Sequence, residues 1–216
     1  MNLAIFDLDH TLLNGDSDYA WGQFLVEQNI VDGQEYETIN RNYYEQYRQG
    51  TLDILEFLAF ALQPLTQHDF DTLNNWHRQF MQQKIEPMIS QAAQALVNKH
   101  RQQSDTLLII TATNSFVTAP IARAFDIDNI IATEPEIKDG RYTGRVSGTP
   151  CFREGKVQRL QAWLSSRDEA FDQIWFYTDS HNDLPLLELV DHPVVVNPDD
   201  ILRQHAQEQR WPIMTL

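Results

Sequence analysis

The chain of 216 residues has a single cysteine, Cys151, and far fewer basic than acidic residues. One cysteine cannot form an intramolecular disulfide or build a cysteine-based zinc cluster, and it is typical of a reducing compartment. The 16 Lys and Arg residues face 31 Asp and Glu residues, which gives a formal net charge of −15 at pH 7. Nucleic acids and anionic membranes are bound through Lys and Arg, so this balance argues against both as partners.

Long hydrophobic runs are also missing. No run approaches the roughly 20 apolar residues that cross a bilayer. The N-terminus, MNLAIFDLD, has no basic segment and only a short apolar stretch before Asp7, so it does not resemble a signal peptide. Hydrophobic residues still make up 42% of the chain, which is enough for a core. We therefore expect a soluble cytoplasmic protein, a monomer or a homodimer, with one domain or one domain carrying an insert.

Short apolar runs alternate with helical patterns in the second half of the chain. The predicted strands are residues 106–111, 129–133, 173–178 and 193–197, and the predicted helices are residues 115–125, 156–164 and 184–190. This alternation is typical of a parallel sheet covered by helices. The first residues, LAIFD, have the same apolar character and should join the sheet. The predicted fold class is therefore α/β, with a Rossmann-like parallel sheet as its core.

Residues 14–88 follow a different pattern. They contain no β-branched run of the kind that forms strands, and apolar residues recur in them at helical spacing. They hold 12 Asp and Glu against 4 Lys and Arg, most of which should face solvent. We predict a helical-bundle cap domain over 14–88, inserted into a core domain formed by 1–13 and 89–216. Within the core domain, residues 136–146 contain Asp139-Gly140, the dipeptide that favours a type I′ hairpin turn.

The segment FDLDHTLL ends an apolar strand with two acids, Asp7 and Asp9. Alternate residues of a strand point to opposite faces, so one acid could be exposed while the other caps a helix. A calcium-binding loop is a second possibility, but Leu12 stands where that loop needs glycine and Asp18 where it needs glutamate. The rest of the sheet provides a third interpretation.

Polar residues also follow the other predicted strands. Thr111 ends one strand ahead of a helix N-terminus, where free backbone N–H groups suit a phosphate. Asp179 and Asp183 follow another strand, and Lys156 lies in the first turn of a helix. Because ligands of parallel sheets bind outside the carboxyl ends of the strands, Asp7, Thr111 and Asp179 should share one site. Clustered acids with a lysine and a hydroxyl predict a Mg²⁺ site beside an oxyanion site.

Four motifs in this order, DLDHT, ITAT, GK and TDSHND, with a helical insert after the first, resemble the haloacid-dehalogenase-like superfamily. The resemblance covers essentially the whole chain and is to the subfamily with a helical cap typified by phosphoserine phosphatase. The stretches DSDYAW, TATNSFVTAPIARAF and GRYTGRVSGTPCFREGK are similar to a bacterial, phosphoserine-phosphatase-like branch. Some members of that branch are histidinol-phosphate phosphatases.

The resemblance implies a role for each motif residue. Asp7 would be the nucleophile that forms an aspartyl-phosphate, and Asp9 would be the general acid and base. Thr111 and Lys156 would hold the transferring oxygens. Mg²⁺ would be bound by Asp7, Asp179 and the backbone carbonyl of Asp9. The supporting phosphate and metal loops would contribute Thr113, Asn114, Asn182 and Asp183.

The resemblance also bears on which small-molecule phosphate monoester is the substrate. Asp16 stands at the spacing from Asp7 at which phosphoserine phosphatases bind the substrate amine, and Arg48 or Arg41 would have to bind the carboxylate of serine. The glycine pair that follows the hydroxyl of the second motif in phosphoserine phosphatases is replaced by Ala112-Thr113. This departure argues against phosphoserine.

The cap contributes further acidic and aromatic residues near Asp16. They are Asp18, Tyr19, Trp21, Tyr43 and Tyr44. Such a surface suits a cationic or heteroaromatic leaving group, although any one of these aromatic side chains could instead pack in the bundle core. Histidinol phosphate, with an amine, an imidazole and no carboxylate, fits this pattern best. Phosphoserine, or transfer of the phosphoryl group to an acceptor alcohol, are the alternatives, and a non-catalytic binding module is a weaker one.

Overall fold

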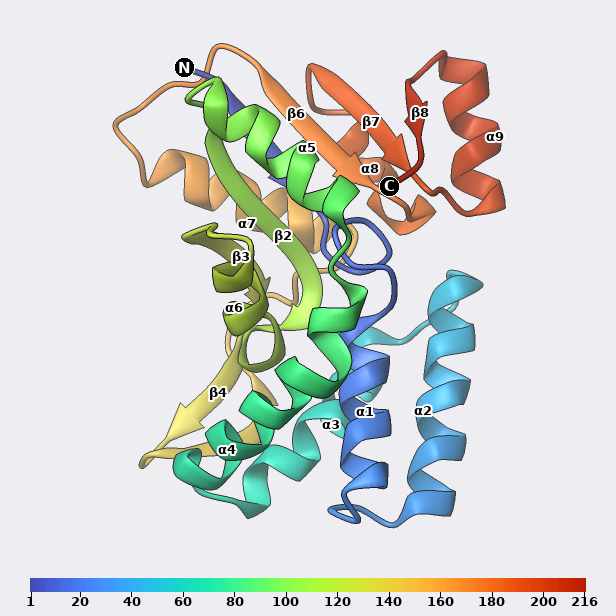
Figure 1. Ribbon diagram of the computed structural model, residues 1–216, viewed down its shortest axis with the longest axis vertical. Helices are drawn as coiled ribbons and strands as arrows, with labels where there is room; N and C mark the ends of the chain where they lie inside the picture. The colour runs from blue at the N-terminus through green and yellow to red at the C-terminus, as the bar shows by residue number, and fades with distance from the viewer.

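The computed structural model describes all 216 residues and contains one six-stranded sheet in the order β3-β2-β1-β6-β7-β8, in which every neighbouring pair is parallel (Figure 1). Its strands are β1 (Leu3–Phe6), β2 (Thr106–Asn114), β3 (Asn129–Thr133), β6 (Ile174–Thr178), β7 (His192–Val196) and β8 (Ile213–Met214). β1 lies at the centre, between β2 and β6. The predicted α/β class and parallel sheet are confirmed.

Helices cover both faces of this sheet. Those of the core are α5 (Gln91–Gln102), α6 (Ser115–Ala124), α7 (Glu154–Ser165), α8 (Leu184–Leu187) and α9 (Asp200–Gln209). Side chains alternate along β1, so Phe6 packs with residues of α5 and α6, whereas Ile5 packs with residues of α7, α8 and α9. The alternation explains why both faces of so apolar a strand are buried.

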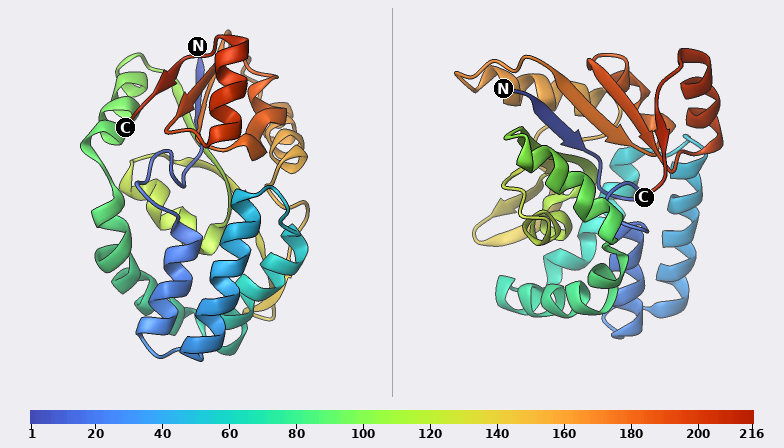
Figure 2. Two further views of the ribbon diagram at one scale, coloured as in Figure 1. Left: turned by 90° about the vertical axis from the view of Figure 1, so that its right-hand side faces the viewer. Right: turned by 45° about the horizontal axis from the view of Figure 1, so that its top comes forward.

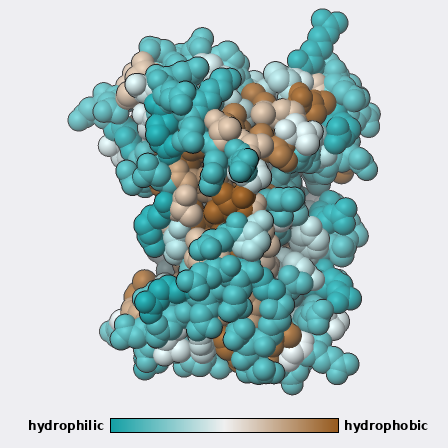
Figure 3. Space-filling view, viewed as in Figure 1, coloured by the Kyte–Doolittle hydropathy of each residue, from teal (hydrophilic) through white to brown (hydrophobic).

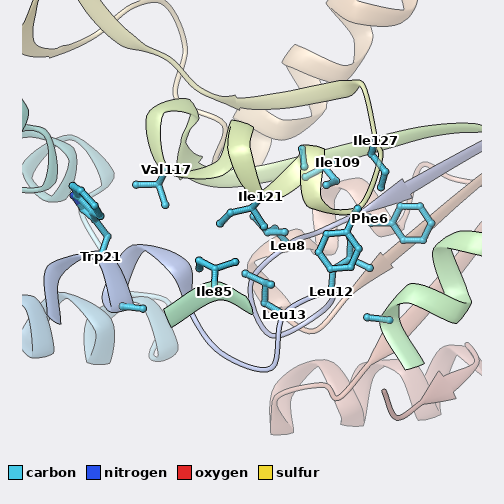
Figure 4. Packing of buried hydrophobic residues seen from close by; sticks show 14 of the residues in the cluster. Phe6, Leu8, Leu12, Leu13, Trp21, Ile85, Ile109, Val117, Ile121 and Ile127 are labelled. Carbon is cyan, nitrogen blue, oxygen red and sulfur yellow. The ribbon is translucent and has the colours of Figure 1, made fainter. Parts of the chain in front are cut away.

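The helical insert shares a hydrophobic core with one face of the sheet. Its helices are α1 (Ser17–Glu27), α2 (Gly33–Arg48), α3 (Ile54–Leu62) and α4 (Phe70–Phe80), with shorter 3₁₀ or π turns at Gln63–Gln67, Met81–Ile85 and Glu86–Met88. Figure 4 shows Leu8 and Leu13 between Phe6 of the sheet and Trp21 of α1. Trp21, expected at the cap surface, is instead buried in this core.

Two segments of the chain, one on each side of the insert, connect it to the sheet domain. Leu13 forms an antiparallel bridge with Ile89, and the N–H of Asn14 donates to the carbonyl of Met88 at 2.8 Å. The four long helices of the insert lie together on one side of these two paired segments, and the sheet lies on the other (Figures 1 and 2). The paired segments lie beside the proposed boundaries at residues 13 and 89. The division into two domains stays a prediction.

The hairpin is formed by β4 (Pro135–Lys138) and β5 (Arg141–Val146), which pair antiparallel. Its turn residues Asp139 and Gly140 have φ of 51° and 72°, as a type I′ turn requires. The hairpin extends from the sheet domain to the insert, where the ring of Tyr142 contacts that of Phe70 at a centroid distance of 5.2 Å. The hairpin prediction is therefore confirmed, and its position gives the insert a second contact with the rest of the chain.

Some element boundaries differ from the predictions. The helix predicted over residues 184–190 ends at Leu187, because the chain must turn to enter β7 at His192. α5, α9 and β8 are not among the predicted elements. No helix is both long and apolar enough to cross a membrane. The face shown in Figure 3 is mostly hydrophilic, with hydrophobic residues gathered near its middle and upper part.

Candidate active site

The structure brings the ends of the central strands together. Asp7 follows β1, and its N–H donates to the carbonyl of Tyr177 in β6 at 2.8 Å, which fixes its backbone at the carboxyl edge of the sheet. Thr111 lies in the neighbouring β2, and Asp179 follows β6 directly. The hydroxyl of Thr11 donates to Asp179 at 3.2 Å, so the loop after β1 also holds the acid that follows β6.

Lys156 lies at the centre of a buried ionic cluster. Its ammonium group donates to Asp7 Oδ1 at 3.0 Å and to Asp183 Oδ2 at 2.8 Å, and all three side chains are buried. Burial alone would lower the pKa of Lys156, but the attraction of Asp183 and Asp7 outweighs it and raises that pKa. Lys156 is therefore charged at neutral pH and is positioned by two carboxylates.

One lysine does not balance the acids around it. Burial, aided by repulsion from Asp183 and Asp9, raises the pKa of Asp7 to about 7, although Lys156 opposes this shift. Burial, with repulsion from Asp7 and Asp183, raises the pKa of Asp179 well above its usual value. The cluster thus has an excess of negative charge that another cation would relieve.

Asp9 is held by the insert and by β2 at once. The N–H of Ser17, the first residue of α1, donates to its Oδ1 at 2.6 Å, and the hydroxyl of Thr113 donates to its Oδ2 at 2.9 Å. Burial, with repulsion from Asp16, raises the pKa of Asp9 to about 6. A carboxyl group with such a pKa can both donate and accept a proton near neutral pH.

The carboxylates could hold a hard cation only with additional oxygen ligands. No three side chains among Cys, His, Asp and Glu converge on a point that would hold a metal ion. Asp7 and Asp179 remain as a pair, and the backbone carbonyl of Asp9 accepts no hydrogen bond from the protein. Mg²⁺ characteristically binds one or two carboxylates and completes its shell with water and phosphate oxygens, so this donor set fits it.

A cavity opens from these strand ends into the insert. Its empty volume is about 570 Å³, including the solvent space at its mouth. The sheet domain contributes Asp7, Asp9, Thr111, Thr113 and Phe152, and the insert contributes, among others, four of the predicted substrate-binding residues, Asp16, Asp18, Tyr19 and Tyr43. Four of the lining side chains are carboxylates, and none is Arg, Lys or His.

Arg48 lies outside this cavity, contrary to its expected place in the substrate site. Its side chain is 62% exposed, lies 3.7 Å from Glu45 and lines the neighbouring cleft with Asp179 and His181. Arg41 is exposed as well and pairs with Glu37 at 2.9 Å. The physical reason is the helical period, because Asn40, Tyr43 and Tyr47 centre the face of α2 that points into the cavity, whereas Arg48 is displaced toward the side of Tyr44, which lines both the cavity and the neighbouring cleft.

Two predicted residues also serve as helix caps. Asp16 accepts a hydrogen bond from the N–H of Tyr19 at 2.7 Å and caps α1, while it also lines the cavity. Asn114 accepts one from the N–H of Val117 at 3.2 Å and caps α6, but it does not line the cavity. Asn182 and Asp183 lie in the turn after β6, where Asp183 also accepts the hydroxyl of Thr178 at 2.7 Å.

Sequence reasoning missed several residues of the cavity. Asn40 and Tyr47 line it together with Tyr43 and Tyr44. These four positions of α2 follow the spacing of one helical face, which is the signal that could have identified them. Burial, with repulsion from Asp7 and Asp179, raises the pKa of Tyr47 well above its usual value, so its hydroxyl stays protonated. Phe152 had no sequence signal of its own.

The chain is similar to several known proteins along most of its length. A family model described as haloacid dehalogenase-like hydrolase matches residues 4–188. A histidinol-phosphatase of Neisseria meningitidis serogroup C (strain 8013) is 47% identical over 217 residues, which cover 99% of this chain and 98% of that protein. A protein with unknown function from Bordetella pertussis Tohama I has a crystal structure with a TM-score of 0.93 and 46% identity, covering 99% of this chain and 97% of that one.

A substrate-bound complex of phosphoserine phosphatase is similar in fold. It has a TM-score of 0.71 at 14% identity and covers 99% of this chain and 92% of that one. With the family match over most of its length, the chain belongs to the haloacid dehalogenase-like hydrolases. Within that family it is a phosphatase, which confirms the class of enzyme that the four motifs predicted.

Proposed function

We propose that this phosphatase hydrolyses L-histidinol phosphate, in a Mg²⁺-dependent reaction that passes through an aspartyl-phosphate on Asp7. The observation that carries the choice of substrate is the charge of the cavity, which has carboxylates and no Arg, Lys or His in its lining. Phosphoserine would bring its own carboxylate into this lining without a counterion, a costly burial. Histidinol phosphate brings an amine and an imidazole, which the acids can pair with.

The residues of the insert are suited to recognise such a leaving group. Burial, with repulsion from Asp16 and Asp9, raises the pKa of Asp18 well above its usual value, and a cationic group bound beside it would favour its ionised form. Tyr19 and Tyr43 line the same space and offer ring faces to a cation or to an imidazole. The identity of 47% with a protein named histidinol-phosphatase supports the same substrate.

The chemistry would take place in two displacements. Asp7 attacks the phosphorus, the ester P–O bond breaks, and Asp9 donates its proton to the departing alkoxide. Asp9, now a carboxylate, then takes a proton from a water molecule that attacks the aspartyl-phosphate and releases phosphate. Lys156, charged and fixed by Asp183, stabilises the negative oxygens of the transferring group.

Asp7 and Asp179 would hold the Mg²⁺ ion, together with the carbonyl of Asp9. When bound, the ion would supply positive charge that keeps both carboxylates ionised and offsets the charge of a dianionic phosphate. The raised pKa values of Asp7 and Asp179 support this assignment, since they mark two buried acids that lack sufficient positive charge. Removal of divalent ions with a chelator should abolish turnover, and added Mg²⁺ should restore it.

The decisive experiment is a screen of the purified enzyme over phosphomonoesters, including histidinol phosphate, phosphoserine, sugar phosphates and p-nitrophenyl phosphate. We expect kcat/KM for histidinol phosphate to exceed that for phosphoserine by about 100-fold, which corresponds to ~2.7 kcal/mol. The reverse preference would overturn the choice of substrate. Asp7→Asn should abolish hydrolysis of every ester, and activity that survives in this variant would refute the mechanism.

Two variants test the cavity directly. Asp16→Asn keeps the cap of α1, because asparagine caps a helix as well as aspartate, and Asp18→Asn keeps the shape of the side chain. Each should raise KM for histidinol phosphate by about 10-fold or more, the effect of losing a charge-assisted hydrogen bond. Hydrolysis of p-nitrophenyl phosphate should change little. Asp71→Asn, an exposed acid of the same insert, is the matched control.

A further inference from the structure

The loop after α2 is attached to the sheet domain by Arg153. The guanidinium group of Arg153 donates to the carbonyl of Gly50 at 2.5 Å and to Oδ1 of Asn182 at 3.1 and 3.0 Å. The amide of Asn182 in turn donates to the carbonyl of Tyr47 at 3.3 Å. These bonds join three separate segments: the end of α2, the start of α7 and the turn after β6.

The loop and the sheet domain fit closely at this point. The end of α2 carries the partial negative charge of its free carbonyls, which the charge of Arg153 complements. Gly50 has φ of +67°, and a Cβ on it would lie 2.7 Å from Nε2 of His181 and 3.3 Å from Nη2 of Arg153. Only glycine therefore allows the loop to approach so closely. The end of α2 that carries the loop is the one directed toward the sheet (Figure 1).

The backbone of Arg153 is strained. Its φ of 50° and ψ of −121° lie in a region that residues with a Cβ rarely adopt. Such strain persists only where the surrounding structure imposes it, and it concentrates at functional sites. Arg153 stands three residues before Lys156, and Asn182 immediately precedes Asp183. The strained residue thus joins the two segments that hold the pair Lys156–Asp183.

We propose that Arg153 is a positioning residue. Its contact with the loop after α2 couples the position of that loop to the alignment of Lys156 and Asp183. One wall of the cavity depends on the same contact, because Phe152 and Tyr47 both line it and their rings lie 6.2 Å apart. The guanidinium group lies 5.0 Å from the centre of the Phe152 ring. The position of the insert and the alignment of Lys156 therefore depend on the same set of contacts. The inference rests on the proposed phosphatase chemistry of this site.

The variant Arg153→Gly separates positioning from stability. Glycine relieves the backbone strain and removes the guanidinium group, so the two effects on Tm oppose each other and we expect little change. We expect kcat/KM for p-nitrophenyl phosphate to fall about 10- to 100-fold, mainly through kcat. Arg153→Lys, which keeps the charge but has a shorter side chain without the planar guanidinium fork, should recover part of the loss. Arg159→Met, on the same helix but paired with Glu134, is the control and should have wild-type kinetics.

A second measurement does not depend on activity. Amide hydrogen exchange of residues 47–51, followed by mass spectrometry, should be about tenfold faster in Arg153→Gly than in the wild type. Gly50→Ala, which disturbs the contact from the side of the insert, should lower kcat/KM as well. The double variant should lose less than the product of the two single losses, because both changes break one contact.

A failure of the proposed coupling can be told apart from a failure of the proposed function. If the wild type hydrolyses no phosphomonoester, the proposed function fails, and hydrogen exchange still tests the contact. If Arg153→Gly retains wild-type kcat and KM, or if it loses activity while residues 47–51 exchange as in the wild type, the coupling is refuted. A lower Tm with unchanged kinetics would show a structural role only and would overturn the proposal. Fully multiplicative losses in the double variant would also overturn it.

Discussion

The ammonium group of Lys156 lies 2.8 Å from Oδ2 of Asp183, and both side chains are only 2% exposed. The same oxygen of Asp183 accepts the hydroxyl of Thr178. Asp183 therefore works as a fixed support, and Lys156 reaches from it to Asp7 at 3.0 Å. A lysine held in this way by two carboxylates is already ordered, so in the proposed reaction it would stabilise charge on an incoming phosphate without first having to be ordered.

Replacing Lys156 with methionine should lower kcat by about 10²- to 10³-fold, the usual cost of removing one preorganised donor. It should also destabilise the protein at pH 8 by about 3 kcal/mol, because two buried carboxylates lose their only cation. The loss should be smaller at pH 5, because the pKa of Asp7 is raised to about 7 and this carboxylate is then mostly protonated. Steady-state kinetics and urea unfolding at the two pH values measure both effects. Lys99→Met, an exposed lysine of α5, is the control.

The core of the site could be predicted from sequence because its positions follow from periodicity. Continuous apolar runs identify parallel strands, and parallel strands bring their carboxyl ends to one edge, so Asp7, Thr111 and Asp179 had to be neighbours. Four ordered motifs added Lys156 and Asp183. These inferences need only the direction of each strand and not its contacts.

The cavity could not be predicted to the same depth. Which face of α2 points inward depends on how the insert packs, so Arg48 was expected in the substrate site and lies outside it, while Asn40 and Tyr47 were missed. α5 and α9 were missed because each is rich in polar residues, with only a narrow apolar stripe toward the sheet. Arg153 was unrecognised because a strained backbone leaves no pattern in the sequence.

Asp18 should make the free energy of unfolding depend on pH. Burial first, and repulsion from Asp16 and Asp9, raise its pKa well above the usual value, so folding favours the protonated form. Its contribution to stability is complete below the usual pKa of an aspartate and is lost as the pH rises through the raised pKa. Asp18→Asn should therefore reduce the fall in stability above pH 4 by up to about 1.4 kcal/mol per pH unit.

Urea unfolding in Mg²⁺-free buffer between pH 4 and pH 8 tests this expectation. The Asp18→Asn protein should be more stable than the wild type at pH 8, and the two curves should converge toward low pH. Asp168→Asn, in an exposed loop, should leave the dependence as it is in the wild type. If the curves for Asp18→Asn and the wild type run parallel, the folded protein does not disfavour the ionised form of Asp18, and the expectation is wrong.

A buried polar network supports the sheet away from the site. His100 of α5 pairs through Nδ1 with Asp105 at 2.7 Å and through Nε2 with the hydroxyl of Tyr177 at 2.7 Å. Tyr177→Phe keeps the stacking on Phe6 but leaves Nε2 of His100 without a partner, which should cost about 1–3 kcal/mol of stability. Chemical denaturation measures this loss, and kcat should not change. Tyr142→Phe, whose hydroxyl makes no hydrogen bond within the protein, is the control, and an equal loss there would contradict the expected role.

Gly22 of α1 lies against Asn40 and Tyr36 of α2. A Cβ at this position would lie 2.9 Å from Cγ of Asn40 and 3.1 Å from Cε1 of Tyr36. Asn40 is buried, and its amide donates to the carbonyl of Tyr19 at 3.2 Å. Both Asn40 and Tyr19 line the cavity, so the packing of the two helices and the shape of this cavity depend on the same glycine.

Gly22→Ala sets two known effects against each other. Alanine favours the helix over glycine by about 1 kcal/mol, whereas overpacking a buried contact costs about 1–3 kcal/mol. We expect overpacking to prevail, because Asn40 must move and then loses its bond to Tyr19. The variant should be less stable by about 1 kcal/mol and should have a raised KM for the preferred ester, since the cavity wall shifts. Gly33→Ala, at the start of α2, meets only Val26 at 3.3 Å and should be neutral or stabilising in thermal unfolding. A Gly22→Ala protein that gains stability and keeps its KM would show that the helices can separate without disturbing the cavity.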